Sequence, residues 1–373
     1  MKSRSFNTVE ISRSALENNY RALERRTKGE TAIMAMVKAD AYGHGMLEAV
    51  EVFRASGCTV FGVAEMREAE ILRQAGVSED IFVTIGFACT DAELFFQHRL
   101  IPVIYDIGSA QSLADRAVAH GTTIGVHIKV DTGMGRLGIL PEESIAFMEA
   151  VEKMAGLQIA GIMSHFPESD NPVSPSTLNG LRIFRGVCTE LKKRYRTVCH
   201  IANSGAVLNF PDTHCDMVRA GIALYGYHPA GAESGGEEVG LVPAMSFSSR
   251  VLQVKNLPAG SGISYGHTFK TKTDTKIAVI PVGYEDGYRR SLSNKGCVLV
   301  RGEYAPVVGR VCMNMCMVDV SRIEAVQPGD EVVLLGSQNE KRITADDLAV
   351  KGDTISYEIL CNLGNSNNRQ YIA

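Results

Sequence analysis

The chain has 373 residues, 45% of them hydrophobic and 21% charged, with a formal net charge of −4. These values allow a packed core in more than one domain, and they exclude a disordered chain and a strongly basic nucleic-acid-binding protein. The sequence has no apolar run of about 18 residues and no apolar signal-peptide core, so we expect a cytoplasmic protein with no membrane segment in this chain. Nine scattered cysteines without CxxC pairs indicate reduced thiols, and we expect no metal site.

Apolar strand patterns and helical patterns alternate up to about residue 230. Helical spacing of apolar residues predicts helices over 13–26, 46–55 and 65–76. Short apolar stretches predict strands that run into Lys38 and over 58–64, 81–85, 101–105, 125–130, 157–163, 197–201 and 217–224. About eight strand–helix units favour the α/β class and a (β/α)8 barrel of the TIM type, which we place at residues 12–232.

The pattern changes after Pro229. Residues 230–240 are rich in Gly and Glu, which indicates a linker or exposed loop. β patterns separated by Gly, Pro and Asp turns follow, over 245–254, 276–282, 298–300, 304–311, 315–320 and 331–335. We therefore expect residues 240–373, together with residues 1–11, to form a second, all-β domain.

The stretch VKADAYGHG, residues 37–45, places Lys38 at the carboxyl end of a strand buried on both faces. Desolvation there favours the neutral amine, which is the nucleophile that forms Schiff bases. A single lysine is more often a solvated surface cation, so its neighbours must decide the assignment. In a barrel, chemistry is concentrated at the carboxyl ends of the strands. Polar residues follow four other predicted strands at this position: Lys129, Arg136, His165, His200, Asn203, Ser204, Arg219 and Gly221.

Several long motifs resemble those of the alanine racemases, bacterial enzymes that use pyridoxal phosphate (PLP). The motifs are VKADAYGHG, HIKVDTGMGRLG, RAGIALYG, SYGHTF, and GRVCM with MVDV, and they span nearly the whole chain. The resemblance implies an amino-acid racemase in which Lys38 holds PLP and acts as base on one face of the substrate α-carbon. Tyr265 resembles the second base, on the opposite face. In the family this tyrosine comes from the β domain of the other subunit, which implies a homodimer with shared active sites.

The resemblance also assigns the groups around the cofactor. Arg219 resembles the arginine that faces the pyridine nitrogen of PLP. Because an arginine does not give up its proton, this nitrogen stays unprotonated, and the weaker electron sink favours reprotonation over transamination. His165 resembles the histidine that passes polarisation between Arg219 and Tyr265. The remaining cofactor ligands that the family implies match Tyr42, Asn203, Ser204, Gly221, Ile222 and Tyr357.

The same motifs imply a substrate side of the site. Arg136 resembles the arginine beside the substrate carboxylate, and Lys129 matches a position that some members carry as a carbamate, so its state is open. Met313 would offer its backbone N–H to the substrate. Tyr284 lies near the entrance in GYEDG, where the family often has GYADG. Asn314 stands where the family usually has aspartate, and its uncharged amide donor would suit a substrate hydroxyl.

The Asn314 exchange is similar to that of the serine racemases found with vancomycin resistance, whose racemase domain follows a membrane-embedded domain. We therefore expect interconversion of L- and D-serine and of L- and D-alanine for peptidoglycan precursors, by a chain that would be the cytosolic domain of a longer membrane protein. A housekeeping racemase specific for alanine is the alternative. A non-catalytic PLP-binding carrier would lack Tyr265 and the β domain. A decarboxylase of this fold would usually need a cysteine-bearing carboxyl-terminal motif, which we do not find.

Overall fold

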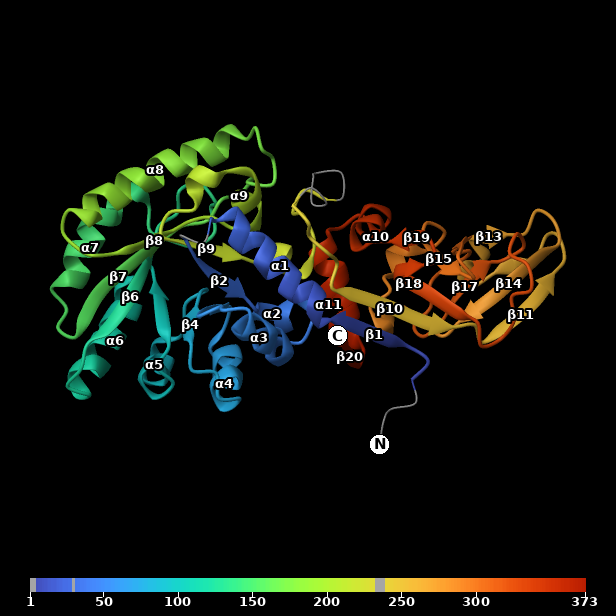
Figure 1. The fold of residues 1–373 in the computed structure, drawn as a ribbon, viewed down its shortest axis with the longest axis horizontal. Helices are drawn as coiled ribbons and strands as arrows, with labels where there is room; N and C mark the ends of the chain where they lie inside the picture. The colour runs from blue at the N-terminus through green and yellow to red at the C-terminus, as the bar shows by residue number, and fades with distance from the viewer. Residues whose placement is uncertain (1–4, 29–30, 232–238) are drawn as a thin grey trace. The chain divides into compact units, whose positions relative to one another are not determined.

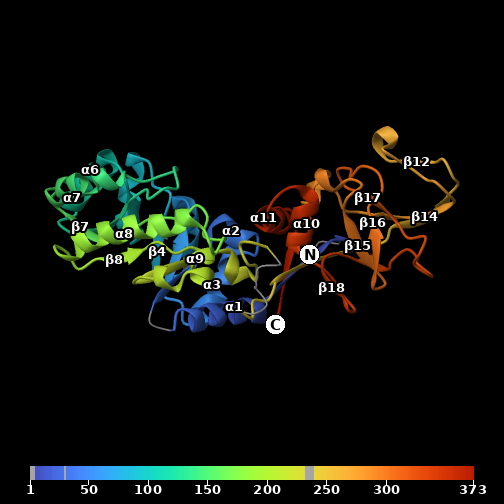
Figure 2. The same cartoon turned by 90° about the horizontal axis from the view of Figure 1, so that it is seen from above.

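The computed structural model describes residues 5–28, 31–231 and 239–373, and the chain divides into two compact units (Figure 1, Figure 2). The barrel unit comprises Leu16–Ala41 and Met46–Leu241. The β unit comprises Met1–Ala15, Tyr42–Gly45 and Val242–Ala373. Of the predicted linker, residues 232–238 lie outside the described residues.

The barrel unit is a ring of eight parallel strands in the order β8-β7-β6-β5-β4-β3-β2-β9. The strands are β2 (Ala32–Met36), β3 (Val60–Val63), β4 (Asp80–Val83), β5 (Ile101–Ile104), β6 (Ile124–Lys129), β7 (Leu157–Met163), β8 (Val198–His200) and β9 (Met217–Ala220). Hydrogen bonds from Asp216 N to Cys199 O (3.1 Å) and from Arg219 N to Ala202 O (2.8 Å) join the last strand to β8 and close the ring. The helices of the unit are α1 (Arg13–Arg26), α3 (Met46–Ala55), α4 (Met66–Gln74), α5 (Ala92–Gln97), α6 (Ile107–Ala119), α7 (Ser144–Glu152), α8 (Pro175–Lys192) and α9 (Ser204–Asn209). The predicted (β/α)8 barrel is confirmed.

Both faces of the barrel sheet are covered, which is why its strands are almost continuously apolar. β2 buries four of its five residues. Large side chains are accommodated where a neighbouring strand carries glycine. A Cβ on Gly62 would lie 2.4 Å from Met36 Sδ, and a Cβ on Gly161 would lie 2.2 Å from the His127 ring. Because the strands themselves are apolar, the polar side chains that could carry out a reaction lie at the strand ends.

One strand boundary differs from the prediction. The strand expected over 217–224 ends as β9 at Ala220, and Ile222–Tyr225 form a 3-10 turn instead. Ser204 Oγ accepts hydrogen bonds from the N–H groups of Gly221 (2.9 Å) and Ala223 (3.3 Å), which turns the chain away from the sheet. A side chain from the neighbouring strand end sets this boundary, and apolar periodicity cannot report such a contact.

The β unit contains a seven-stranded sheet of order β16-β15-β18-β10-β1-β20 with β19 paired to β18, a three-stranded sheet β11-β14-β17, and the pair β12-β13. The strands are β1 (Thr8–Ser12), β10 (Met245–Arg250), β11 (Gln253–Leu257), β12 (Gly262–Ile263), β13 (Phe269–Lys270), β14 (Thr275–Ile280), β15 (Cys297–Val300), β16 (Glu303–Pro306), β17 (Cys316–Asp319), β18 (Glu331–Gln338), β19 (Lys341–Ile343) and β20 (Arg369–Ile372). β1 pairs antiparallel with β10 and parallel with β20.

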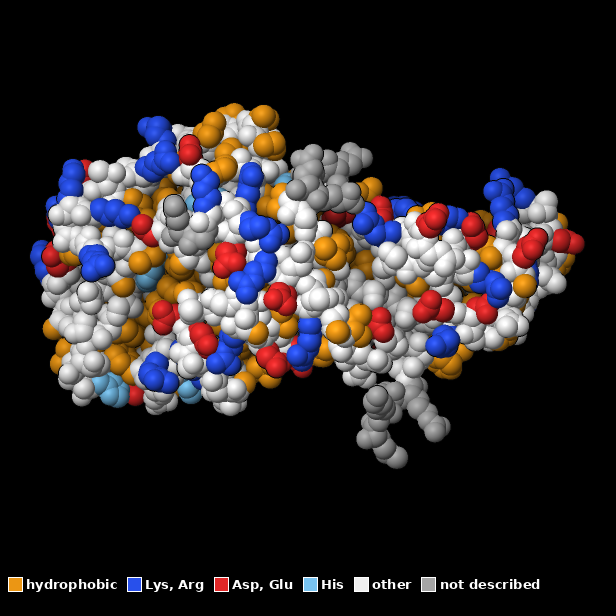
Figure 3. Space-filling view, in the orientation of Figure 1, with side chains coloured by type: hydrophobic (Ala, Val, Ile, Leu, Met, Phe, Trp, Pro, Cys, Tyr) orange, Lys and Arg blue, Asp and Glu red, His pale blue; other side chains and the backbone are white. Residues whose placement is uncertain are grey.

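Acidic and basic side chains are interspersed on the face shown in Figure 3. Among the described residues, no helix has both the length and the apolar character to cross a bilayer.

The predicted β class of this unit is confirmed, but two helices lie where the strand pattern assigned nothing, α10 (Ala345–Gly352) and α11 (Ser356–Ser366). Thr344 caps α10. Asp347 N donates to Thr344 Oγ1 (3.1 Å), and Thr344 N donates to Asp347 Oδ2 (2.8 Å). This reciprocal cap is present in the sequence as TADD and could have predicted the start of the helix.

Gly364 on α11 packs against the backbone of Gly43, and a Cβ at position 364 would lie 1.9 Å from Gly43 O. We expect Gly364→Ala to lower the free energy of unfolding by about 1–3 kcal/mol, because the backbone must move to admit the methyl group. Gly186→Ala on α8 is the control, since nothing lies within 4 Å of its added Cβ and alanine favours a helix. Urea unfolding measures both. A Gly364→Ala protein as stable as its parent would show that α11 shifts at no cost.

Candidate active site

Lys38 follows the buried strand β2 and is half-buried itself. The next four residues, Ala39 to Tyr42, have φ between 53 and 56°, which is the left-handed conformation. Each non-glycine residue there costs about 1–2 kcal/mol, and consecutive ones are rare. Ala41 N donates to Val37 O (2.8 Å), and Asp40 Oδ1 accepts from Met46 N at the start of α3 (2.7 Å). Lys38 therefore stands at the base of a strained turn that is pinned by hydrogen bonds.

Arg219 in β9 is 4% exposed and is held by the ends of β7 and β8. Its Nη1 donates to His200 O (2.9 Å) and to His200 Nδ1 (3.1 Å). Its Nη2 donates to Ser164 O (2.5 Å), Ile201 O (3.1 Å) and His165 Nδ1 (3.3 Å). Within the described residues, none of these partners is a carboxylate. Burial and the charge of Arg136 lower the pKa of Arg219 to about 10, so the guanidinium stays charged at neutral pH.

The histidines near Arg219 are neutral. Burial and the charge of Arg219 hold the pKa values of His165 and His200 well below the usual range, and that of His127 at about 3. Because a guanidinium only donates, His200 Nδ1 must accept and the His200 proton is on Nε2. This Nε2 lies 2.9 Å from His127 Nδ1, which accepts in turn. A directed chain of hydrogen bonds thus runs from Arg219 through His200 to His127, with a fixed tautomer in each ring.

His165 lies between Arg219 and Asn203. Its Nδ1 accepts from Arg219, so its proton is on Nε2. Asn203 Nδ2 is 3.4 Å from that nitrogen, and Asn203 Oδ1 accepts from Ala206 N (3.1 Å), which fixes the orientation of the amide. Two donors that face each other cannot share a proton. The Nε2–H of His165 is therefore a donor that Asn203 does not accept.

Lys129 ends β6 and is 6% exposed. Burial and the positive charges of Arg219, Arg136 and Lys38 lower its pKa to about 8. Asp131 opposes this shift, but its carboxylate already accepts three backbone N–H groups of its own loop. Lys129 is therefore a buried amine in a site rich in cations, and it loses its proton at about pH 8.

Ser204 begins α9 at the end of β8 and is 4% exposed. Its Oγ accepts the N–H groups of Gly221 and Ala223, so its own hydroxyl proton is left to donate. An oxyanion such as a phosphate fits beside a buried hydroxyl of this kind. Gly221 is one of the cofactor ligands that the family resemblance implies, and its N–H is bonded to Ser204 in this structure.

Six predicted site residues lie in the β unit: Tyr42, Tyr265, Tyr284, Met313, Asn314 and Tyr357. The rings of Tyr42 and Tyr357 pack together with their centroids 5.9 Å apart. Tyr284 and Met313 lie on two loops that are bonded to each other, since Tyr284 N donates to Cys312 O (3.0 Å) and Glu285 N donates to Met313 O (3.0 Å). These loops form one rigid patch of the β unit.

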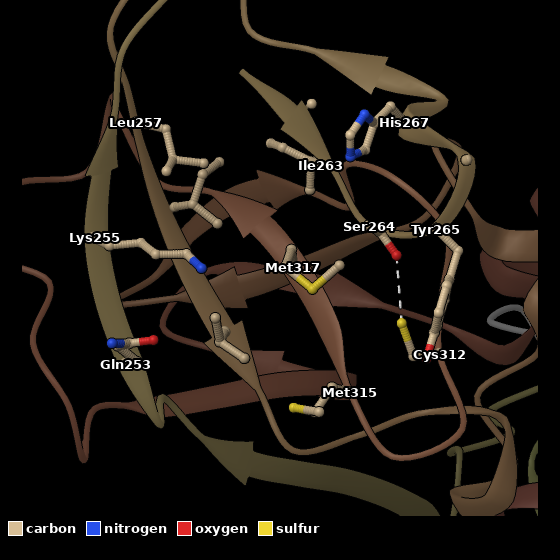
Figure 4. Close-up of a pocket in the computed structure, with 14 residues that line it drawn as sticks. Gln253, Lys255, Leu257, Ile263, Ser264, Tyr265, His267, Cys312, Met315 and Met317 are labelled. Carbon is tan, nitrogen blue, oxygen red and sulfur yellow. Dashed lines mark hydrogen bonds between the residues drawn. The ribbon is translucent and has the colours of Figure 1, made fainter.

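Tyr265 lines a hollow of about 670 Å³ in the β unit, shown in Figure 4. Ser264 fixes its loop, because Ser264 Oγ donates to Arg310 O (2.7 Å) and lies 3.3 Å from Cys312 Sγ. Tyr265 is 71% exposed, and Met313 is 52% exposed. Tyr265 and the exposed Met315 line the same hollow, and large exposed side chains that gather in this way mark a binding surface.

The structure brings most of the predicted barrel residues together. Arg219 is bonded to His165, Asn203 lies beside that ring, and Lys38, Lys129 and Arg136 share the electrostatic field of the group. We call the carboxyl ends of the barrel strands and the loops that follow them the barrel rim. His127 and Glu68 also belong to it, although the sequence analysis did not predict them. His127 could have been found, because it precedes Lys129 by two residues and residues i and i+2 of a strand share a face.

Comparison with known proteins identifies the family. The family model described as "Alanine racemase, N-terminal domain" matches residues 11–229, and "Alanine racemase, C-terminal domain" matches residues 244–371. The chain belongs to the alanine racemase family. An alanine racemase from Syntrophobacter fumaroxidans is 41% identical over 364 residues, which is 97% of this chain and 96% of that protein.

Two solved alanine racemases share the fold over nearly their whole length. The enzyme of D-cycloserine-producing Streptomyces lavendulae has a TM-score of 0.94 at 34% identity, covering 100% of this chain and 98% of that one. The enzyme of Bartonella henselae, solved with covalently bound pyridoxal phosphate, has a TM-score of 0.88 at 30% identity, covering 98% and 99%. The predicted family and enzyme class, an isomerase, are confirmed. Of the two substrate readings, the alanine-specific alternative fits the names of these relatives better than dual specificity for serine and alanine.

The lowered pKa of Lys129 predicts a pH-dependent stability. Between about pH 8 and its usual pKa of 10.5 the amine is protonated in the unfolded chain and neutral in the folded one, so stability rises with pH across this window. We expect Lys129→Met to remove this rise, which for such a shift is about 3 kcal/mol. Urea unfolding across and below the window measures it, with the exposed Lys153→Met as control. If the free energy of unfolding changed with pH in the same way in Lys129→Met and its parent, the protonated Lys129 would not destabilise the folded protein.

Proposed function

We propose that this protein interconverts L- and D-alanine with pyridoxal phosphate as cofactor, using Lys38 and Tyr265 as its two bases. The observation that carries the proposal is Arg219, whose partners in the described parts of the chain are carbonyl oxygens and imidazole nitrogens, with no carboxylate among them. A pyridine nitrogen that faces such a group stays unprotonated. This weaker electron sink favours return of the proton to carbon, which suits racemisation.

The residues of the barrel rim fit this cofactor. Lys38 would hold it through its amine, and the Ser204 hydroxyl proton would bind its phosphate, with further contacts from Tyr42, Asn203, Gly221, Ile222 and Tyr357. When bound, pyridoxal phosphate supplies an electron-withdrawing ring that makes the Cα–H of an attached amino acid acidic. The relative from Bartonella henselae, which holds this group covalently, supports the assignment.

Racemisation requires one group to remove a proton from the α-carbon and another to return a proton on the opposite face. The ε-amine of Lys38 is proposed to act on one face and the hydroxyl of Tyr265 on the other. A phenol has a pKa of about 10 in water and is a poor base unless positive charge lies close. His165 is proposed to link Tyr265 to the charge of Arg219 through its Nε2–H.

The remaining predicted residues would bind the substrate. Arg136 and the backbone N–H of Met313 are proposed to hold its carboxylate, and Tyr284 to line the entrance. Lys129 carries its proton only weakly, so it is proposed to sit beside Arg136 as a neutral amine or as a carbamate. A carbamate would add an anion beside Arg136, where the nearby Asp131 carboxylate is already bonded to three backbone N–H groups of its own loop.

We propose a homodimer in which Tyr265 of one subunit completes the site of the other. The exposed side chains of Tyr265, Tyr284, Met313 and Met315 in the β unit support this, because large side chains of this kind are usually covered in an assembly. A two-fold interface uses the same surface twice and would complete two sites. A non-catalytic carrier has no need for this patch, which argues against that alternative.

Mixing two inactive variants tests the shared site. Lys38→Ala should lose the visible absorbance of lysine-bound cofactor, and Lys38→Ala and Tyr265→Ala should each lose at least about 100-fold in alanine racemisation. After co-refolding, half of the dimers are mixed, and each carries one intact site, so about a quarter of the parent activity should return. Lys38→Ala mixed with itself is the control. No recovery in mixed dimers would contradict sharing, and an intact absorbance band in Lys38→Ala would contradict the role of Lys38.

Serine turnover, in vancomycin resistance, is a second candidate function with one observation in its favour. Asn314 Nδ2 donates to the carboxylate of Glu285, and both residues depart from the pattern of the family. The pair places an amide and a carboxylate, both of which bind hydroxyl groups, next to Met313. Because the relatives named above are alanine racemases, we propose alanine as the main substrate, with D-alanine supplied to peptidoglycan precursors in the cytoplasm.

Asn314→Asp tests the serine proposal. The change would set a second carboxylate against Glu285 and remove the amide donor, so kcat/KM for L-serine relative to L-alanine should fall by about 5- to 10-fold, the value of one hydrogen bond. A coupled assay for the D-products measures both substrates. Asn179→Asp, exposed on α8, is the control. An unchanged ratio would remove Asn314 from substrate selection.

A further inference from the structure

One carboxylate joins the loops that follow two neighbouring strands. Glu68 lies in the first turn of α4, and its Oε1 accepts a hydrogen bond from Ala39 N (2.7 Å). Its Oε2 accepts from Ala64 N (2.7 Å) and Glu65 N (3.2 Å), in the loop after β3. Because β2 and β3 are parallel neighbours, the carboxylate ties the turn after β2, which carries Lys38, to the start of α4.

The hydrogen bond from Ala39 N to Glu68 acts on the backbone directly after Lys38. The N–H of Ala39 belongs to the peptide group that joins Lys38 to Ala39. A peptide group is planar, so fixing its direction sets ψ of Lys38 and φ of Ala39 together. Ala39 is also the first of the four left-handed residues, a conformation that alanine does not adopt by itself. A charged acceptor makes a stronger hydrogen bond than a neutral one and can hold this group in place.

We infer that Glu68 is a positioning residue for Lys38. By fixing the peptide group that follows Lys38, its carboxylate holds the amine in the geometry that cofactor binding and proton transfer require. It acts through the backbone and not by touching the substrate. The inference rests on the proposed function, which gives Lys38 its role. The hydrogen bond itself does not depend on that function.

A simpler role for Glu68 is to cap α4, and two variants separate the roles. Glu68→Asp keeps the charge in the first turn of α4, but its side chain is one methylene shorter and withdraws from Ala39. Glu68→Gln keeps the length but replaces one oxygen by a donor. The remaining oxygen is favoured by the two N–H groups of Ala64 and Glu65, so Ala39 N loses its acceptor. Glu70→Gln on the same helix is the matched control, since its carboxylate lies 3.6 Å from His98 Nε2 and makes no bond to the Lys38 turn in the described structure.

Hydrogen exchange of the holoenzyme, resolved over residues 38–46, directly measures how firmly the Glu68 carboxylate holds the turn after Lys38. We expect the amides of Ala39 to Tyr42 to exchange at least about tenfold faster in Glu68→Asp and Glu68→Gln, and at the parent rate in Glu70→Gln. We also expect kcat for alanine to fall by at least about tenfold with KM within about twofold, because a small displacement of a catalytic group acts mainly on the chemical step. The pH at which the visible band of lysine-bound cofactor titrates should shift in both Glu68 variants.

Three results would overturn the inference. These are parent-like exchange in both Glu68 variants, an unshifted absorbance titration, or a loss of kcat that follows the loss in Tm equally in all three variants. The proposed function fails separately, if the parent protein does not racemise alanine. Faster exchange and a shifted titration in the Glu68 variants alone would still support the positioning of Lys38 in that case.

Discussion

The buried charge of Arg219 is the constraint on which the rest of the barrel rim depends. A guanidinium without a carboxylate must be stabilised by dipoles, and backbone carbonyl oxygens at the ends of β7 and β8 supply them. Those strand ends therefore have to converge on one side chain. Burial, together with this charge, keeps the nearby imidazoles neutral and lowers the pKa of Lys129. Burial and one cation thus act in the same direction on the protonation states of these neighbours.

The β unit fixes its functional side chains by a different means, the close approach of backbone to backbone. A Cβ on Gly283 would lie 2.1 Å from Met313 O, so the turn that carries Tyr284 can meet the Met313 loop only because position 283 is glycine. The hydrogen bonds of Ser264 fix the loop of Tyr265 in a similar way. The exposed tyrosines of this unit are therefore mounted on a rigid base, which suits the role at a subunit interface that we propose for Tyr265.

Much of the fold and of the barrel site could be predicted, because a periodic sequence reports strands and helices and a barrel gathers the strand ends. Lys38, Arg219 and Ser204 follow from that rule together with the family motifs. Glu68 does not, because it resembles an ordinary residue of a first helical turn and its partner Ala39 is 29 positions away. The sequence also cannot predict which ring nitrogens of His200 and His127 carry the protons, because these tautomers are set by the long-range contact with the Arg219 guanidinium. The early end of β9 and the start of α10 depend on single side chains.

The left-handed turn after Lys38 has a stereochemical consequence. Ala39 and Ala41, at φ of 53 and 54°, follow the path that is comfortable for the mirror-image amino acid. D-Alanine built into these positions by chemical synthesis would keep the path and relax it, whereas glycine would relax it and open many others. The methyl groups of the natural residues therefore raise the energy of the turn, but they also restrict the backbone conformations that it can adopt. In a member of the alanine racemase family, the lysine that we propose as a base stands beside alanines whose backbone has the handedness of the D-enantiomer.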